Sequence, residues 1–157
     1  MNFTVMKSIQ HLIKHKPKPF TFDTKFNDIV EFIEDNQYSH FPVLEQDVYV
    51  GSIAALDIQP SETKTVNDFR YTLQPFYVRK DASWFEVLEK FAQFDCNILA
   101  VLNENNNYIG YYFQEDILPF LNTTPFMKDA GLAIVVQKHY LDYSISEIAQ
   151  ILETNNC

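Results

Sequence analysis

Two aspartates stand at the same distance from a glycine in different halves of the chain. Asp57 follows Gly51 by six positions, and Asp116 follows Gly110 by six positions as well. An ionised carboxylate accepts hydrogen bonds through its two oxygens and donates none. Both aspartates are therefore candidate acceptors in a ligand site. The alternative is that they are ordinary carboxylates at helix starts or on the surface.

Signatures of catalysis are missing from the sequence. It contains no glycine-rich loop for phosphate or dinucleotide binding, no Gly-x-Ser-x-Gly and no His-Glu-x-x-His. The two cysteines form no metal-binding pair, and we expect Cys96, which precedes an apolar run, to pack as a small hydrophobe. Scattered histidines show no metal-ligand spacing: His11, His15, His40 and His139. We therefore predict that the chain is not an enzyme and holds no metal ion.

Composition and charge limit the remaining classes of protein. The chain has 157 residues, of which 46% are hydrophobic, enough for the core of one ordinary domain or two small ones. It carries 21 acidic and 12 basic side chains, a net charge of −9. Duplex nucleic acid usually requires a basic face that neutralises several phosphates, so we expect no nucleic-acid partner.

Membrane insertion and secretion are not expected either. No apolar run approaches the roughly 20 residues that span a bilayer, and the first residues lack the apolar centre of a signal peptide. The two cysteines provide no disulfide framework. These features predict a protein of the reducing cytoplasm.

The chain contains an internal repeat, which accounts for the matching Gly–Asp pairs. A shift of 58 residues superposes residues 23–44 on residues 81–102, apolar position on apolar position. One extra residue in the next turn raises the shift to 59, which places Asp57 on Asp116. Self-similarity at one fixed period indicates two copies of the same structural unit.

Each copy predicts the same five elements in the same order. An extended piece comes first, then an amphipathic helix, two strands joined by a polar turn, and a brief closing helix. The helices are indicated by apolar side chains at i, i+3, i+4 and i+7, which share one face. In the first and second copy the ranges are 19–22 and 75–78, 26–36 and 84–94, 41–44 and 98–102, 48–53 and 108–113, with closing helices that begin near Ala54 and Gln114.

Three segments make up the first 122 residues. Residues 16–68 are the first repeat with its linker, and residues 69–122 are the second repeat. The polar stretch 59–73 is predicted to be the connection between them, since it carries Pro60 and several hydroxyl residues. Residues 1–15 are predicted to be an amphipathic helix, because four apolar residues share one helical face: Val5, Ile9, Leu12 and Ile13.

The two copies resemble a tandem pair of CBS domains, a Bateman module. The resemblance is carried by Ser-His-Phe-Pro-Val-Leu at 39–44, by Asn-Ile-Leu-Ala-Val-Leu at 97–102, and by the segments 51–57 and 110–116, which run from Gly to Asp. It covers roughly residues 16–122. It implies an α/β (α+β) fold in which tandem β-α-β-β-α repeats pack as a pseudo-twofold pair, and it implies a homodimer formed through the repeats.

The same resemblance implies an adenosine-type ligand, AMP or another adenosine compound, in the cleft between repeats. In such pairs the glycine lets the backbone approach the ligand and the aspartate accepts hydrogen bonds from ribose hydroxyls. The hydroxyl residue usual three positions after the glycine is replaced by Ala54 and Phe113, and Phe113 can fill the second cleft. The implied site residues are Gly51, Gly110, Asp57, Asp116, His40, Phe41, Pro42 and Ala54.

The first cleft is the better candidate, because Ala54 leaves space in it. His40 is equally interpretable as a packed histidine of the cleft rim. Few cations lie nearby in the sequence, so a monophosphate, a nucleoside or an uncharged ligand is easier to accommodate than a triphosphate. No other cofactor is indicated.

We predict that the C-terminal residues 126–157 form a further β-α segment. A strand is predicted at 132–136 and a helix from Ser144 to about residue 153, with Glu147 completing a capping box. This segment resembles the opening strand and helix of an ACT domain, similar to bacterial proteins that carry two CBS repeats followed by ACT. The glycine usual in the ACT ligand loop is absent from residues 137–143.

Two functions remain open at this point. The first is a non-enzymatic regulatory module that binds an adenosine-type ligand between its repeats. The second is a CBS-like interaction scaffold with degenerate pockets, which binds a protein partner through its aromatic face. A ligand-binding module predicts saturable stabilisation that Asp57→Ala removes, whereas a scaffold predicts an exposed apolar patch and no response to small molecules.

Overall fold

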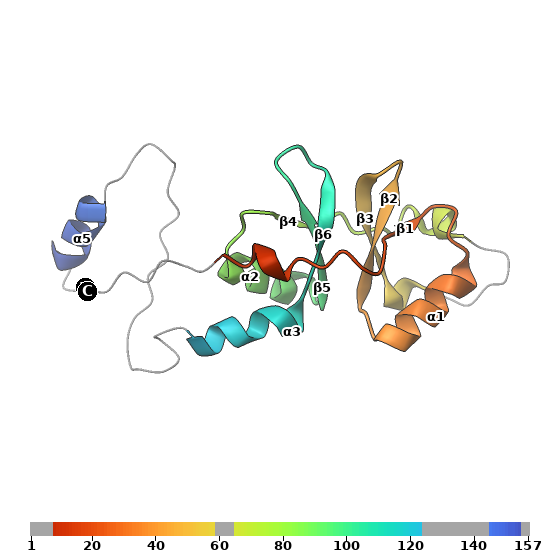
Figure 1. Cartoon of the computed structure of the whole chain (residues 1–157), viewed down its shortest axis with the longest axis horizontal. Helices are drawn as coiled ribbons and strands as arrows, with labels where there is room; N and C mark the ends of the chain where they lie inside the picture. Colours follow the sequence, from red (N-terminus) through yellow and green to blue (C-terminus); the bar gives the residue numbers. More distant parts are fainter. Residues whose placement is uncertain (1–7, 59–64, 124–144, 155–157) are drawn as a thin grey trace. The chain divides into compact units, whose positions relative to one another are not determined.

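The computed structural model describes residues 8–58, 65–123 and 145–154 (Figure 1). The chain divides into one unit from Met1 to Thr123 and a second from Thr124 to Cys157. The first unit holds both repeats in a mixed α+β fold, as the sequence predicts. In the second unit the described residues form one helix, α5 (Ile145–Thr154), close to the helix predicted there. The strand predicted at 132–136 lies outside the described residues.

The first repeat is a three-stranded sheet with one helix. Parallel β1 (Phe20–Thr21) and antiparallel β3 (Val48–Ala54) flank β2 (His40–Glu45). Between β1 and β2, α1 (Phe26–Asn36) buries the apolar face predicted from its spacing and ends at a residue with left-handed backbone geometry. A single 3-10 turn, η2 (Ala55–Asp57), follows β3 and carries the first candidate aspartate.

The second repeat has the same topology. Its sheet consists of β4 (Val78–Arg79), β5 (Ile98–Leu102) and β6 (Tyr108–Phe113), and α2 (Trp84–Phe94) packs between β4 and β5. The closing helix α3 (Gln114–Ile117) continues into the 3-10 turns of η4 (Leu118–Thr123). The β-α-β-β order predicted for both copies is confirmed, and the closing element is an α-helix in the second copy and a 3-10 turn in the first.

The ends of the two helices match at the level of single residues, whereas their starts differ. Ser83 accepts a bond from the Glu86 amide at the start of α2, at 3.2 Å, while the equivalent Lys25 before α1 forms no side-chain cap. The helices α1 and α2 end at Gln37 and Asp95, which are equivalent positions with φ of 54° and 48°. Because both helices stop at the same place in the repeat, the strands that follow them start in register.

The two repeats exchange their leading segments. The Lys14 amide donates to the Tyr111 carbonyl of β6 at 2.9 Å, and the Ser52 amide of β3 donates to the Gln74 carbonyl at 2.9 Å. Ser52 and Tyr111 are equivalent under the 59-residue shift, so each leading segment pairs with the last strand of the other repeat. Figure 1 shows the N-terminal segment running past the second repeat before it enters the first.

This exchange also distributes the core residues. Ile9 is 1% exposed and packs in the second repeat's core with Trp84 and Phe91. Val66 and Phe69, which precede the first strand of the second repeat, are buried in the core of the first. Each core is therefore completed by residues that come before the other repeat in the sequence.

Two predictions about connecting segments are wrong, because both segments pack into the core of the other repeat. Over residues 8–15 the structure has a short 3-10 turn, η1 (Gln10–Leu12), and then extended chain, where a helix was expected; residues 1–7 lie outside the described residues. Ile9 reaches the core and Lys14 pairs with β6, so burial and hydrogen bonding are satisfied without a helix. The segment 65–73, predicted as polar linker, contains the core 3-10 helix η3 (Val66–Phe69), held by a capping box between Thr65 and Asp68.

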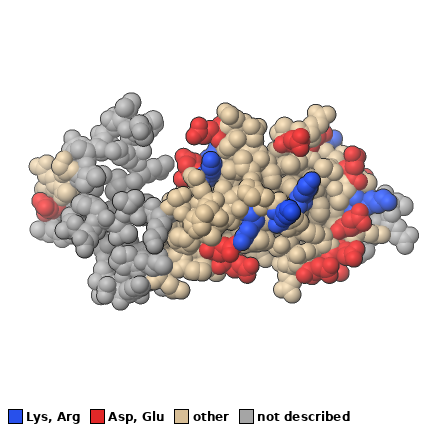
Figure 2. Space-filling view, in the orientation of Figure 1, with Lys and Arg blue, Asp and Glu red and all other residues tan. Residues whose placement is uncertain are grey.

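Charge is spread unevenly over the surface that the structure describes. Figure 2 shows acidic side chains around both repeats and a short stripe of basic side chains in the middle of the face drawn. No helix among the described residues is long and apolar enough to cross a membrane.

Candidate ligand site between the repeats

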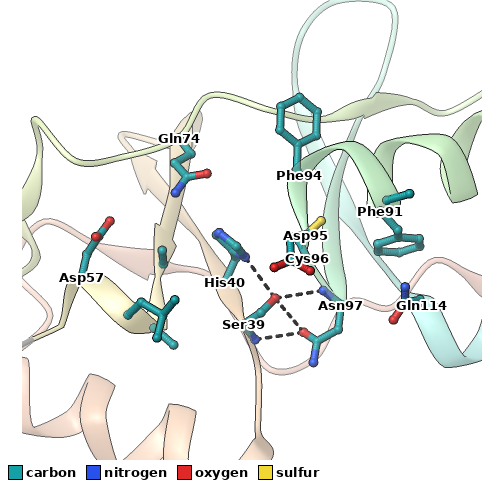
Figure 3. A pocket seen from close by; sticks show the side chains of 14 residues that line it. Ser39, His40, Asp57, Gln74, Phe91, Phe94, Asp95, Cys96, Asn97 and Gln114 are labelled. Atoms are coloured by element: carbon teal, nitrogen blue, oxygen red, sulfur yellow. Dashed lines mark hydrogen bonds between the residues drawn. The ribbon is translucent and has the colours of Figure 1, made fainter.

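A cavity of about 670 Å³ lies where the first repeat meets the end of α2, and we call it the inter-repeat cavity. Its volume falls within the roughly 300–1,000 Å³ usual for small-molecule sites. The first repeat contributes the start of β2, the end of β3 and η2. The second contributes the end of α2, the residues that lead into β5 and the first residue of α3 (Figure 3). The lining residues used below are Ser39, His40, Ala54, Asp57, Gln74, Phe91, Phe94, Asp95, Cys96, Asn97 and Gln114.

Ser39 and Asn97 join the two repeats in the wall of this cavity. They occupy equivalent positions in the repeat, and they bond to each other. The Ser39 amide and hydroxyl donate to Asn97 Oδ1 at 2.9 and 3.0 Å, and the Asn97 amide donates to Ser39 Oγ at 2.9 Å (Figure 3). Asn97 Nδ2 also donates to the Gln37 carbonyl at 3.0 Å. These bonds fix the start of β2 against the start of β5.

His40 is the buried titratable group of the cavity. It is 7% exposed, its Nδ1 lies 3.0 Å from Ser39 Oγ, and its ring meets the Phe76 ring edge to face at 5.2 Å. Burial lowers the pKa of His40 below its usual value, and the carboxylates of Asp57 and Asp95 offset this only in part. The imidazole is therefore neutral at pH 7.

Two carboxylates border the cavity. Asp57 and Asp95 lie on opposite sides of His40 in the view of Figure 3. Both residues are exposed, and in the described part of the chain neither carboxylate forms a hydrogen bond or an ion pair. Asp57 is thus available to accept hydrogen bonds from a bound hydroxyl compound.

Cys96 lines the cavity as a buried thiol. It is 4% exposed, and burial raises its pKa to about 12. A thiol with so high a pKa is a poor nucleophile at neutral pH, which agrees with the prediction that Cys96 packs as a small hydrophobe. Among the residues that the structure describes, no group of three His, Cys, Asp or Glu side chains could hold a metal ion.

The equivalent cleft of the second repeat has a different interior. Phe113 stacks on Tyr38 at 5.2 Å and meets Tyr111 edge to face at the same distance, in a cavity of about 400 Å³. Asp116 does not line that cavity, and its Oδ2 lies 3.3 Å from the Lys14 ammonium of the N-terminal segment. An aromatic ring and an ion pair thus occupy the positions that Ala54 and the free Asp57 hold in the first repeat.

Of the eight site residues expected from the sequence, three line the inter-repeat cavity: His40, Ala54 and Asp57. Phe41 and Pro42 are buried outside it. The Phe41 ring packs against Phe20 and Phe32 at 4.6 Å each. The alternation of side chains along β2 turns this ring to the other face of the sheet from His40.

Gly51 and Gly110 have the leading segments as their neighbours. Gly110 has a φ of +147°, and a Cβ there would overlap the Lys14 carbonyl oxygen and lie 2.5 Å from Ile13 Cγ2. At Gly51, with a φ of +141°, a Cβ would lie 3.0 Å from Leu73 Cβ. Neither glycine lines the cavity, so the close approach that each permits in this structure is that of the exchanged chain segment.

Sequence reasoning missed the second repeat's contribution to the site. Phe91, Phe94 and Asp95 belong to the end of α2, which the motifs did not include. The 58-residue shift carries one usable signal, because it places Asn97 on Ser39, next to His40. Gln74 could not be found this way, since its place in the cavity depends on the exchange of leading segments.

A comparison with protein families gives one match. Residues 66–122 match the CBS domain model. This range includes the whole second repeat, and the first repeat shares its topology. No curated protein has a sequence that matches the chain.

Solved structures with the same fold are pairs of CBS domains. The CBS domains of a transcriptional regulator from Streptococcus pneumoniae have a TM-score of 0.61 at 18% identity, over 72% of this chain and 98% of that one. A CBS domain pair/ACT domain protein from Thermotoga maritima has a TM-score of 0.65 at 14% identity, over 74% and 98%. CBSX2, solved in complex with AMP, has a TM-score of 0.59 at 14% identity, over 74% and 96%. The shared fold is that of a CBS domain pair.

Proposed function

We propose that this chain is a regulatory module without enzymatic activity, and that it binds an adenosine-type ligand in the inter-repeat cavity. The observation that carries the proposal is the meeting of His40, Ala54 and Asp57 with the end of α2 around one cavity of ligand size. The AMP complex of CBSX2, which has the same fold, supports this class of ligand.

The lining residues supply the contacts that such a ligand requires. Asp57 accepts hydrogen bonds from the ribose hydroxyls, and the Ala54 methyl leaves room beside it. The side-chain amides of Gln74 and Gln114 both donate and accept, so they suit the edge of a base. The Phe91 and Phe94 side chains give the cavity an apolar wall.

Regulation follows from the position of the cavity between two repeats. Its walls come from both repeats, so a bound ligand contacts both and favours the arrangement in which both contacts are made. A ligand shifts such an equilibrium only by the difference in its affinity for the two arrangements. The output is then carried by a partner protein or by association of the module with itself.

We propose that the module forms a homodimer through its CBS repeats. Support comes from Phe85, which is 40% exposed on α2 although it is a large apolar residue.

We expect the module to act in the cytoplasm, because its sequence offers no disulfide framework. We retain the ACT-like assignment of residues 126–157 as part of the proposal. Helix α5 and the fold match to a protein with an ACT domain support it.

The proposed function is tested by thermal melting and calorimetric titration with adenosine, AMP, ADP and ATP. A ligand at 100 times its Kd stabilises the folded protein by about 2.7 kcal/mol. We expect at least one of these compounds to bind, with about one molecule per chain since the second cleft is smaller and its Asp116 is paired with Lys14, and Asp57→Ala to remove the stabilisation. Glu34→Ala, an exposed carboxylate on α1 away from the cavity, is the matched control and should bind as the native chain does.

Two results would count against this function. If no adenosine compound stabilises the folded protein, the interaction scaffold with degenerate pockets becomes the better explanation. If a compound binds and Asp57→Ala leaves its affinity unchanged, the ligand lies outside the inter-repeat cavity.

A further inference from the structure

The inter-repeat cavity is lined by negative groups on both sides. Asp57 comes from η2 of the first repeat and Asp95 from the residue after α2 of the second. Figure 3 shows the two carboxylates on either side of His40. A ligand that lies along His40 between the two repeats is therefore near two carboxylates at once.

Helix α2 adds a partial negative charge at the same place. Its last residues, including Phe91 and Phe94, line the cavity. The carbonyl groups of the last turn leave the C-terminus of a helix with about half a unit of negative charge. The 11-residue helix thus favours a cation at this end over an anion.

No positive charge lines the cavity in the part of the chain that the structure describes. His40 does not provide one, because burial lowers its pKa and keeps the ring neutral at pH 7. Lys90 lies in α2, directly before the lining residue Phe91. Its ammonium donates to Gln93 at 3.0 Å and lies 5.5 Å from the centre of the Phe94 ring, so it is already engaged outside the cavity.

The second repeat has a lysine at a position where the inter-repeat cavity has an uncharged side chain. Lys14 pairs with β6 at the position where Gln74 pairs with β3, and its ammonium neutralises Asp116 at 3.3 Å. In the first repeat this position holds the uncharged amide of Gln74, so the leading segment provides no counterion for Asp57. The two clefts therefore differ in net charge although their backbones are equivalent.

We propose that the inter-repeat cavity selects adenosine compounds that carry no phosphate, and that it prefers those with a positive charge on the ribose 5′ side. This inference rests on the proposed function and defines its ligand class more narrowly. It excludes AMP, ADP and ATP as the preferred ligands of this chain. The groups responsible are Asp57, Asp95 and the C-terminal end of α2, with Gln74 in place of a lysine.

A matched series of three ligands tests the charge preference. Adenosine, AMP and 5′-amino-5′-deoxyadenosine share base and ribose and differ at the 5′ position, which is neutral, dianionic or cationic at pH 7.5. Unit charges several ångströms apart near a protein surface change affinities by about tenfold. We expect adenosine to bind about tenfold or more tightly than AMP, and the amino compound at least as tightly as adenosine. Raising the salt concentration should narrow both differences.

Variants then assign the preference to the named groups. Asp57 forms the ribose contact, so Asp95→Asn is the cleaner test of charge, and asparagine tolerates the φ of 48° at this position. We expect Asp95→Asn to reduce the ratio of adenosine to AMP affinity severalfold, chiefly by strengthening the binding of AMP. Gln74→Lys, which copies the second repeat, should reduce the ratio further. Glu34→Ala is again the control and should keep the native ratio.

The outcomes separate this inference from the proposed function. Tighter binding of AMP than of adenosine overturns the charge preference and leaves the adenosine site in place. Absence of binding by all three compounds overturns both. An adenosine preference that neither Asp95→Asn nor Gln74→Lys changes would contradict the assignment to these groups.

Discussion

His40 links the cavity to the stability of the folded chain. The ring is 7% exposed, and burial lowers its pKa in the folded state relative to the unfolded chain. Asp57 from η2, Asp95 from the end of α2 and the Gln74 side chain face it and weaken that effect. A histidine of this kind binds its proton more readily in the unfolded state, so protonation favours unfolding.

The resulting prediction concerns the pH dependence of unfolding. The contribution of His40 to the free energy of unfolding should be fully present above about pH 6.5, the pKa of an unperturbed histidine. It should decrease as the pH falls through 6. His40→Asn removes this group and should lose less stability between pH 7.5 and 5.5 than the native chain, as measured by urea denaturation. His11→Asn, at an exposed position, serves as the control. Equal pH dependence in His40→Asn and the native chain would contradict the prediction.

At the scale of elements, the exchanged leading segments contribute to the stability of each repeat by packing against its last strand. Gly110 and Gly51 are the places where these segments pass closest to a strand. Both glycines have positive φ, but a Cβ at Gly110 would overlap backbone, while one at Gly51 meets Leu73 at the limit of contact. The two glycines thus differ more in the room available for a Cβ atom than in backbone strain.

We predict that Gly110→Ala destabilises the protein by about 3 kcal/mol or more, and Gly51→Ala by about 1–2 kcal/mol. The larger effect arises because the N-terminal segment must move away from β6, which also exposes Ile9. Urea denaturation of the two variants measures the difference. A closely similar loss in both would mean that the positive φ alone determines the cost, without a contribution from the leading segments.

Local sequence patterns were sufficient for the repeating elements and insufficient for the segments between them. The helices at 26–36 and 84–94 were predicted to the residue, because apolar spacing fixes which face is buried. The cavity needed more information. His40, Ala54 and Asp57 line the cavity from within one copy, and its motifs had named them as candidates, whereas Gln74 and Asp95 reach the cavity only through the packing of one copy on the other. Contacts between distant segments leave no periodic signal in a single sequence.

At the scale of the whole molecule, the expected assembly is a dimer of two 18.4 kDa chains. Phe85 stands near the start of α2, where an acidic substitution suits the helix N-terminus and should leave folding intact. We predict that Phe85→Glu shifts the sedimentation equilibrium from dimer toward monomer. Tyr71→Glu introduces the same charge at a residue that is 94% exposed between the repeats, and it should leave the dimer unchanged. A native chain that sediments as a monomer would refute the proposed dimer.

The exchanged segments also set an order of events during synthesis on the ribosome. The chain emerges from its N-terminus, so Ile9 and Lys14 are exposed long before β6, their partner at residues 108–113, has been made. At about 5–20 residues per second, the N-terminal segment waits on the order of 5–20 seconds for this partner. The first repeat waits less, because Val66 and Gln74 follow its last strand closely. The first repeat can thus fold while the second is still being translated. Ile9 and Lys14 reach their native contacts only after β6 has been made.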